Sequence, residues 1–223
     1  MRAGVPITLP PPLLFLDQNT PQGILPEFIS SLAQILGREH SVLALARPRI
    51  PVYLEKGKLD FFCYTIPAWS PIKDKLTWSA PLFLKREIIV GPAPLPKSLD
   101  EFKGVVIGTS LDYTYPNLNP YFQDKSLVRE DAPTDEANLK KLLSNRVSYV
   151  VIDEVFFDYF KNNHPEIEEK RQRLLVQEYP IACAISPHSK LTKKEFDGAV
   201  QKLKTSKKLE ALFKKYNLSV QVL

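Results

Sequence analysis

A stiff, proline-rich break divides this chain of 223 residues into two parts. Residues 91–96 hold three prolines in six positions, a composition that favours neither a helix nor a central strand. Before the break, short apolar runs alternate with amphipathic stretches, and the same alternation resumes after it. Such alternation is typical of βαβ units with a mostly parallel sheet. The chain is therefore predicted to be an α/β protein with two lobes.

Hydrophobic periodicity places the expected elements in both parts. Before the break we predict strands at 2–8, 41–46, 58–64 and 86–90, with helices that begin near Pro26 and Pro51. After it we predict strands at 105–108, 149–152 and 174–185, helices at 131–144 and from 155, and two amphipathic helices at the end of the chain. The spacings of Ser98 with Glu101 and of Thr192 with Glu195 predict helix capping boxes.

Two extended crossings, near 89–93 and 182–186, are expected to join the lobes as a two-strand hinge. Lobe one then comprises residues 1–90 and 186–223, and lobe two comprises residues 91–185. Ligands of open α/β sheets bind outside the carboxyl ends of the strands. We therefore expect a small solute to bind in a cleft where the two lobes face one another.

The net charge of +5 is concentrated near the end of the chain. Residues 187–223 hold nine lysines and three acidic residues, and the rest of the chain is close to neutral. These lysines fall on the polar faces of two predicted helices, without aromatic residues interleaved on the same face. Nucleic-acid sites combine positive charge with base-contacting elements, so we predict a solvated surface and no nucleic-acid partner.

The two cysteines, Cys63 and Cys183, do not have metal-ligand spacing, and we expect no metal or other cofactor. Both lie in apolar, strand-like runs, which favours buried free thiols and leaves a disulfide as the alternative. The first residues contain no apolar stretch before a cleavage site, so the chain is either cytoplasmic or a mature form. No apolar run approaches the roughly 20 residues that span a bilayer.

Several short motifs follow one another along nearly the whole chain. They are PLLFLD (12–17) with GILPEF (23–28), RIPVYLEKGKLD (49–60), WSAPL (78–82), GVVIG (104–108), LLSNRVSYVVID (142–153) and LEALFKKY (209–216). In this order they resemble the periplasmic solute-binding proteins of the polar amino-acid type, which serve ABC transporters. The resemblance implies the type II fold, a periplasmic location with the signal peptide removed, and a membrane permease as partner. We expect a monomer that binds a small-molecule ligand.

One departure from the family changes the expected ligand. Counted without gaps, the family's Thr and Arg, which hold the α-carboxylate of an amino acid, fall on Trp69 and Ile72. The neighbouring Lys73 offers a point charge rather than a bidentate fork. We therefore predict that the ligand is not an ordinary α-amino acid. The alternative is that Pro67 and Pro71 mark a loop in which the alignment slips.

Five residues are candidates for ligand contacts. The resemblance assigns Asp153 to the ligand's ammonium group, and a helix cap is its other natural role. Arg49 stands where a variant of the family carries an Arg, either to hold an anion or as a surface residue. Trp69 and Tyr113 are suited to stack on a planar ligand, or to pack in the core or rim. Thr114 lies in the loop where the family binds anions through backbone N–H groups.

Three functions remain open. A binding protein that serves transport is the first, and a ligand-sensing module of a signalling receptor would have the same fold and cleft. The third, a dehydratase-like enzyme, is disfavoured because Glu154 is the only acid beside Asp153, and adjacent strand residues point to opposite faces. None of the three histidines has a Ser or Cys partner in view. We therefore predict a binding protein rather than an enzyme.

Overall fold

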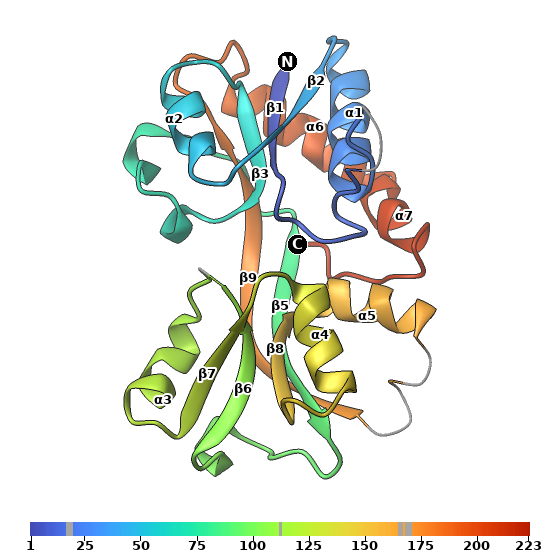
Figure 1. The fold of residues 1–223 in the computed structure, drawn as a ribbon. Helices are drawn as coiled ribbons and strands as arrows, with labels where there is room; N and C mark the ends of the chain where they lie inside the picture. The colour runs from blue at the N-terminus through green and yellow to red at the C-terminus, as the bar shows by residue number, and fades with distance from the viewer. Residues whose placement is uncertain (17–19, 112, 165–166, 168–170) are drawn as a thin grey trace. The chain divides into compact units, whose positions relative to one another are not determined.

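The computed structural model describes residues 1–16, 20–111, 113–164, 167 and 171–223, which form two compact units. Asp17 of the first motif lies outside the described residues. Unit 1 comprises Met1–Leu84 and Tyr179–Leu223, and unit 2 comprises Lys85–Glu178. The chain passes between them within β5 (Phe83–Pro92) and within β9 (Arg171–Ile185) (Figure 1). The expected boundaries, at 90 and 185, fall later in the same two strands, because extended backbone carries no local signal of where a unit ends.

Unit 1 is built on strands in the order β2–β1–β3–β9. The strands that belong to it are β1 (Arg2–Pro6), β2 (Ser41–Leu45), β3 (Phe61–Thr65), the short β4 (Thr77–Trp78) and the later part of β9. β1 runs parallel to β2 and β3, whereas β9 pairs antiparallel with β3 and β4. The strands predicted in this part of the chain are confirmed, with shifts at their ends.

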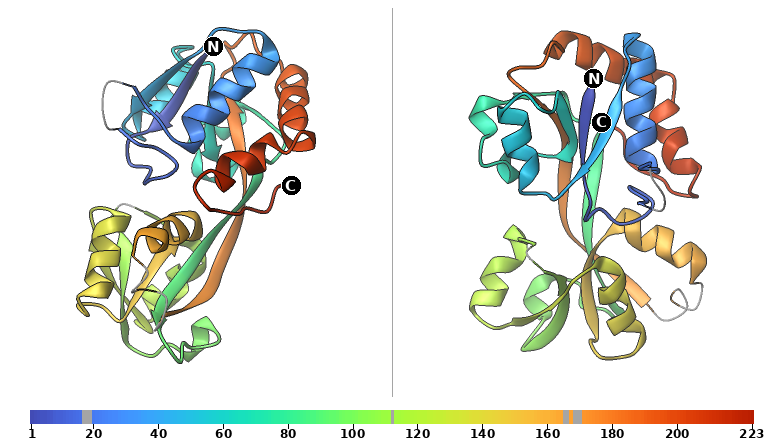
Figure 2. Two further views of the ribbon diagram at one scale, coloured as in Figure 1. Left: turned by 90° about the vertical axis from the view of Figure 1, so that its right-hand side faces the viewer. Right: turned by 45° about the horizontal axis from the view of Figure 1, so that its top comes forward.

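Helices cover both faces of the unit 1 sheet (Figures 1 and 2). They are α1 (Ile24–Leu36), α2 (Arg49–Glu55), α6 (Lys193–Thr205) and α7 (Lys208–Lys214), with the short 3-10 helices η1 (Pro67–Trp69) and η2 (Lys73–Lys75). On one face Ile50 and Leu54 of α2 pack on Phe62. On the other, Phe61 meets Phe196 of α6, with ring centroids 5.2 Å apart. α6 in turn packs on α1 and α7.

Local signals fix helix ends in unit 1. Gly37 ends α1 in the left-handed conformation, with φ of 61°, which a glycine adopts without a steric penalty. Before α6, the Thr192 hydroxyl accepts the N–H of Glu195 at 3.2 Å, and the Glu195 carboxylate accepts the N–H of Thr192 at 2.9 Å. The capping box predicted from the spacing of these two residues is therefore confirmed.

Cys63 and Cys183 form a disulfide, so the expectation of free thiols is wrong. The two residues are direct partners in the antiparallel pairing of β3 with β9, their Cα atoms are 4.0 Å apart, and both are buried. A strand around each cysteine was predictable from the sequence. That these two strands are neighbours, across 120 positions of the chain, was not.

Unit 2 has the strand order β9–β5–β8–β6–β7. Its further elements are β6 (Val105–Ser110), β7 (Leu127–Ala132), β8 (Tyr149–Asp153), η3 (Leu99–Glu101), η4 (Pro116–Leu118), α3 (Asn119–Gln123), α4 (Asp135–Leu143) and α5 (Glu154–Asn163). β6 is parallel to β7 and β8, and β5 is antiparallel to β8. None of the helices in the described part of the chain is long and apolar enough to cross a membrane.

Alternation along the strands of unit 2 builds a core on each face of its sheet. Ile88 and Ile152 pack with residues of α4 and α5 on one face. Their strand neighbours Ile89 and Val151 pack with Leu118 and the region around α3 on the other. Both faces are thus covered, which explains why residues 88–90 of β5 and 150–152 of β8 are all apolar.

Two predictions for unit 2 are wrong. The helix expected at 131–144 begins at Asp135, because residues 127–132 continue the sheet as β7, parallel to β6. Ser98 and Glu101 do not form a capping box, since Ser98 makes no side-chain cap and Glu101 instead accepts the N–H of Lys97 at 3.0 Å. In the first case strand pairing overrides a weak local pattern, and in the second the Glu101 carboxylate accepts from Lys97 rather than from the cap residue.

Candidate ligand-binding site

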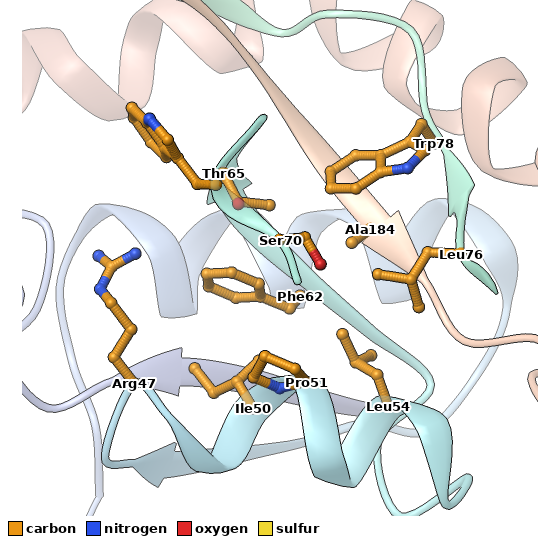
Figure 3. Close-up of a pocket in the computed structure, with 11 residues that line it drawn as sticks. Arg47, Ile50, Pro51, Leu54, Phe62, Thr65, Ser70, Leu76, Trp78 and Ala184 are labelled. Atoms are coloured by element: carbon orange, nitrogen blue, oxygen red, sulfur yellow. The ribbon is translucent and has the colours of Figure 1, made fainter. Parts of the chain in front are cut away.

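A small pocket, of about 50 Å³, opens in unit 1 between α2, the end of β3 and the loop that carries η1 and η2 (Figure 3). The described residues that line it are Arg47, Ile50, Pro51, Leu54, Phe62, Thr65, Trp69, Ser70, Leu76, Trp78 and Ala184. Sites for small ligands typically have such a lining, mostly apolar and aromatic with a few polar groups. The pocket is therefore the candidate site of unit 1.

A β-bulge decides which side chains of β3 face this pocket. Between Cys63 and Thr65 the pairing with β9 shifts its register, and Tyr64 adopts a positive φ of 67°. Simple alternation would place Tyr64 on the same face as Phe62. Instead, Tyr64 contacts Phe83, with ring centroids 6.1 Å apart, and Thr65 lines the pocket together with Phe62. Bulges re-aim side chains in this way beside many binding sites.

Among the described residues of the lining, Arg47 is the one charged side chain. It lies just beyond the carboxyl end of β2, where ligands of α/β sheets commonly bind. In the view of Figure 3 its guanidinium lies at one end of the pocket and Trp78 at the other, with Phe62 between them. Thr65 and Ser70 contribute hydroxyl groups. A guanidinium with nearby hydroxyls suits an anionic group on a ligand.

The predicted contact Arg49 lies on the exposed surface of α2 and does not belong to the pocket lining. Its guanidinium donates a hydrogen bond to the hydroxyl of Tyr53 and lies 5.1 Å from the centroid of that ring. Sequence reasoning missed Arg47, two positions earlier. The available signal was its place at the carboxyl end of a predicted strand.

Trp69, also a predicted contact, lines the pocket. It belongs to η1, and its ring meets that of Tyr179 edge-on, with centroids 4.9 Å apart. Trp78, the first residue of the WSAPL motif, lines the pocket too, and its indole N–H donates to the carbonyl of Lys73 at 3.0 Å. Ile72, at the family's Arg position, is half-buried outside the lining. Both indoles are thus held by contacts within unit 1.

Three buried charges meet in unit 2. The Nζ atom of Lys85 lies 3.0 Å from a carboxylate oxygen of Glu87 and 3.4 Å from one of Asp153. The antiparallel pairing of β5 with β8 sets Glu87 opposite Asp153, and Lys85 shares a face with Glu87 because it is two residues away. Asp153 also accepts the N–H of Val155 at 2.9 Å, so its predicted role as the cap of α5 is confirmed. Its role toward a ligand stays a prediction, and the ammonium group beside it is that of Lys85.

Arg129 holds the loop that follows β6. It donates to the carbonyls of Ser110 and Tyr113, at 2.9 and 2.8 Å. The hydroxyl of Tyr115 accepts the N–H of Ser110 at 2.9 Å, and burial raises the pKa of Tyr115 to about 12, so this hydroxyl stays neutral. The ring of Tyr113 packs on that of Tyr115, with centroids 4.8 Å apart, whereas Thr114 is exposed. Of the two predicted contacts in this loop, Tyr113 is therefore held by ring packing, whereas Thr114 is exposed.

Asp135 is a further acidic residue of unit 2 and is half-buried. It follows the cap residue Thr134 at the start of α4, and the hydroxyl of Ser110 donates a hydrogen bond to it. Burial raises the pKa of Asp135, and the hydrogen bond from Ser110 opposes this only in part. The nearby carboxylate of Asp153 raises the pKa further. Asp135 therefore keeps its proton to a higher pH than an exposed aspartate does.

Glu154 is the first residue of α5 and not the strand residue expected from the sequence. Its carboxylate lies 3.3 Å from Arg173 and 3.7 Å from Arg86, whereas Asp153 faces Lys85. The two acids thus have different partners, which argues against an acid–base pair at this position. The described residues contain no group of three or more metal-binding side chains.

Solved structures with this fold include binding proteins and sensors. The GluR0 ligand-binding core from Nostoc punctiforme, in complex with L-glutamate, matches with a TM-score of 0.73 and 17% identity, over 96% of this chain and 98% of that one. The substrate-binding protein of an amino-acid ABC transporter matches with a TM-score of 0.71 and 14% identity, over 97% and 98%. A histidine kinase sensor domain with similarity to periplasmic binding proteins matches with a TM-score of 0.75 and 18% identity, over 100% and 97%.

At these identities the likeness establishes the fold. The chain has the type II architecture of the periplasmic binding proteins, two α/β lobes joined by two strands, as the motifs predicted. No family model and no curated protein sequence matches it.

Proposed function

We propose that the chain captures a small solute at the pocket of unit 1 and delivers it to the membrane permease of an ABC transporter. The pocket carries this proposal, because aromatic walls with one guanidinium and two hydroxyl groups form a surface suited to a small organic molecule. The fold supports it as well, since one of its structural neighbours is the substrate-binding protein of such a transporter. Capture alone needs no catalytic group.

The proposed ligand is not an ordinary α-amino acid. Counted without gaps, the position of the family's carboxylate-binding Arg falls on Ile72 in this chain. The acid that the resemblance assigns to the ligand's ammonium group is Asp153, which already lies 3.4 Å from the ammonium group of Lys85. A second ammonium group there would meet a like charge, which disfavours it.

A sensing module is the second candidate, and one observation favours it. The histidine kinase sensor domain matches over the full length of this chain, so the fold serves signalling as well as transport. Ligand capture would then act on a receptor rather than on a permease. Genes for a permease and its ATPase beside the gene of this chain would support transport, whereas a neighbouring kinase or receptor gene would support sensing.

We further propose a periplasmic location. The disulfide between Cys63 and Cys183 supports it, because disulfides persist in oxidising compartments such as the periplasm and are rare in the cytosol.

A thermal-shift screen tests the proposed function. Free ligand at 100 times its Kd should stabilise the protein by about 2.7 kcal/mol, a visible rise in the midpoint. The panel should pair amino acids such as L-glutamate, L-glutamine and L-arginine with solutes of similar size that lack the amine. We expect stabilisation by one or more of the amine-free solutes and none by the amino acids. The Trp69→Leu variant should reduce the stabilisation, since Trp69 lines the pocket.

Two outcomes would contradict the proposal. A clear shift with an ordinary amino acid would show that the site accepts an α-amine together with a carboxylate, and the proposed ligand class would be wrong. If native mass spectrometry of protein purified without refolding and the whole panel both show no bound solute, solute capture itself is wrong.

A further inference from the structure

We infer that the ligand is a small organic carboxylate with a flat apolar body, whose carboxylate is held by Arg47 and whose body packs on the aromatic side chains of the pocket. This inference rests on the proposed function and specifies the class of solute.

The charge of the lining selects the charged end of the ligand. Arg47 carries a positive charge at every pH of interest, and the other described lining residues are apolar, aromatic or hydroxyl-bearing. A guanidinium offers paired N–H donors that match the two oxygens of a carboxylate, and the hydroxyls of Thr65 and Ser70 are further donors. A cationic ligand would meet the charge of Arg47, whereas a carboxylate would be attracted to it.

The walls of the pocket select the rest of the ligand. Phe62, Trp69 and Trp78 present aromatic surface, and Ile50 and Leu54 close the base with side chains that are each 1% exposed. A volume of about 50 Å³ is small for a ligand site, which disfavours a long or many-ringed molecule. Flat apolar groups pack well against such indole and phenyl surfaces.

The walls are also held in place before a ligand arrives. Trp78 is fixed by its hydrogen bond to the Lys73 carbonyl, and Trp69 by its edge-on contact with Tyr179. Walls that need not reorganise lower the entropic cost of binding. Because Arg47 lies at one end of the pocket in Figure 3 and Trp78 at the other, the ligand should bind with its carboxylate toward the connection between β2 and α2.

Isothermal titration with three matched probes tests the inference. Benzoate, benzamide and benzylamine share one ring and differ in charge, so their affinities at one ionic strength separate ring packing from charge recognition. We expect benzoate to bind at least about tenfold more tightly than benzamide, the lower end of what a charged hydrogen bond contributes. Benzylamine should bind most weakly.

Variants assign the preference to particular side chains. Arg47→Gln should remove the difference between benzoate and benzamide, and Arg47→Lys should restore part of it, because a point charge replaces the fork. Lys56→Gln is the matched control: it removes the same charge from an exposed residue at the end of α2, outside the lining. Trp69→Leu should weaken benzoate and benzamide alike. Unfolding midpoints of all variants check that each is folded.

Failure of the proposed ligand class can be distinguished from failure of solute capture itself. The inference is overturned if benzamide binds as tightly as benzoate, if the preference survives in Arg47→Gln, or if benzoate fails to bind at millimolar concentration. In each case the proposed capture of a solute still stands if another member of the wider panel stabilises the protein and Trp69→Leu reduces that effect.

Discussion

The two units of this protein differ in where they place charged side chains. Unit 1 places the guanidinium of Arg47 at the wall of a pocket, among aromatic side chains. Unit 2 buries the ammonium group of Lys85 between the carboxylates of Glu87 and Asp153. Under the proposed function the first charge meets a ligand, whereas the second is compensated within unit 2 and belongs to its fold. Both arrangements occur in one chain, so an acid at a family motif position, such as Asp153, is not by itself evidence of ligand contact.

The units also differ in how they are held together. Both cysteines lie in unit 1, where the disulfide joins β3 to β9, and unit 2 has no such cross-link. Both tryptophans, Trp69 and Trp78, lie in unit 1 as well. Tryptophan fluorescence therefore reports on unit 1, while far-UV circular dichroism reports on both units. Comparing the two signals allows the units to be tested separately.

The largest effect is expected from Lys85→Met. It leaves the carboxylates of Glu87 and Asp153 buried without their cation, which typically costs about 3–5 kcal/mol. In urea, the dichroism signal should lose part of its amplitude at a lower concentration, before the fluorescence changes. Adding Glu87→Gln and Asp153→Asn to this variant should recover much of the loss.

Lys103→Met, an exposed lysine of the same unit, is the control and should leave both signals nearly unchanged. If Lys85→Met unfolds at the same urea concentration as the native protein, the charges of unit 2 are not what holds its sheet together, and the contrast between the units fails.

The next effect concerns the disulfide. The double variant Cys63→Ala, Cys183→Ala should lose about 2–4 kcal/mol, because the unfolded chain regains the freedom of a long loop. This loss should appear in the fluorescence transition, which reports on unit 1. A fall in the dichroism signal that precedes the fluorescence change would instead show that unit 2 depends on the cross-link.

The smallest expected effect is on the pH dependence of stability, in which two aspartates of unit 2, Asp135 and Asp131, should differ. Because burial raises the folded-state pKa of Asp135, its contribution to stability decreases as pH rises from the unfolded-state value, about 4, through the folded-state value. Asp135→Asn keeps an acceptor for the Ser110 hydroxyl and removes this dependence, so it should stabilise unit 2 at neutral pH.

Asp131 should behave in the opposite way. Burial tends to raise its pKa, but hydrogen bonds from Thr109 and Arg129 outweigh this and lower it. Its contribution to stability is therefore present at neutral pH and decreases as pH falls below the unfolded-state value. Asp131→Asn should destabilise unit 2 at neutral pH and have little effect in acid. Urea midpoints measured between pH 3 and 8 by dichroism check both variants, and equal pH profiles would contradict the assignment.

Local patterns in the sequence determined a large part of the fold. The helix end at Gly37, the capping box of Thr192 and Glu195, and the short apolar runs at 88–90 and 150–152 each follow from residues that are near one another in the chain. The order of weak motifs then predicted the type II architecture. These features could be read in advance because their physical causes, capping and side-chain periodicity, act within a few residues.

Only the tertiary structure decided the features that depend on which strands are neighbours. The bond between Cys63 and Cys183 needs β3 beside β9, and the meeting of Lys85 with Asp153 needs β5 beside β8. The choice of Arg47 over Arg49 as the pocket residue depends on where α2 begins relative to β3. Contacts between distant parts of a chain are set by how its elements pack, and spacing along the sequence carries almost no information about that packing.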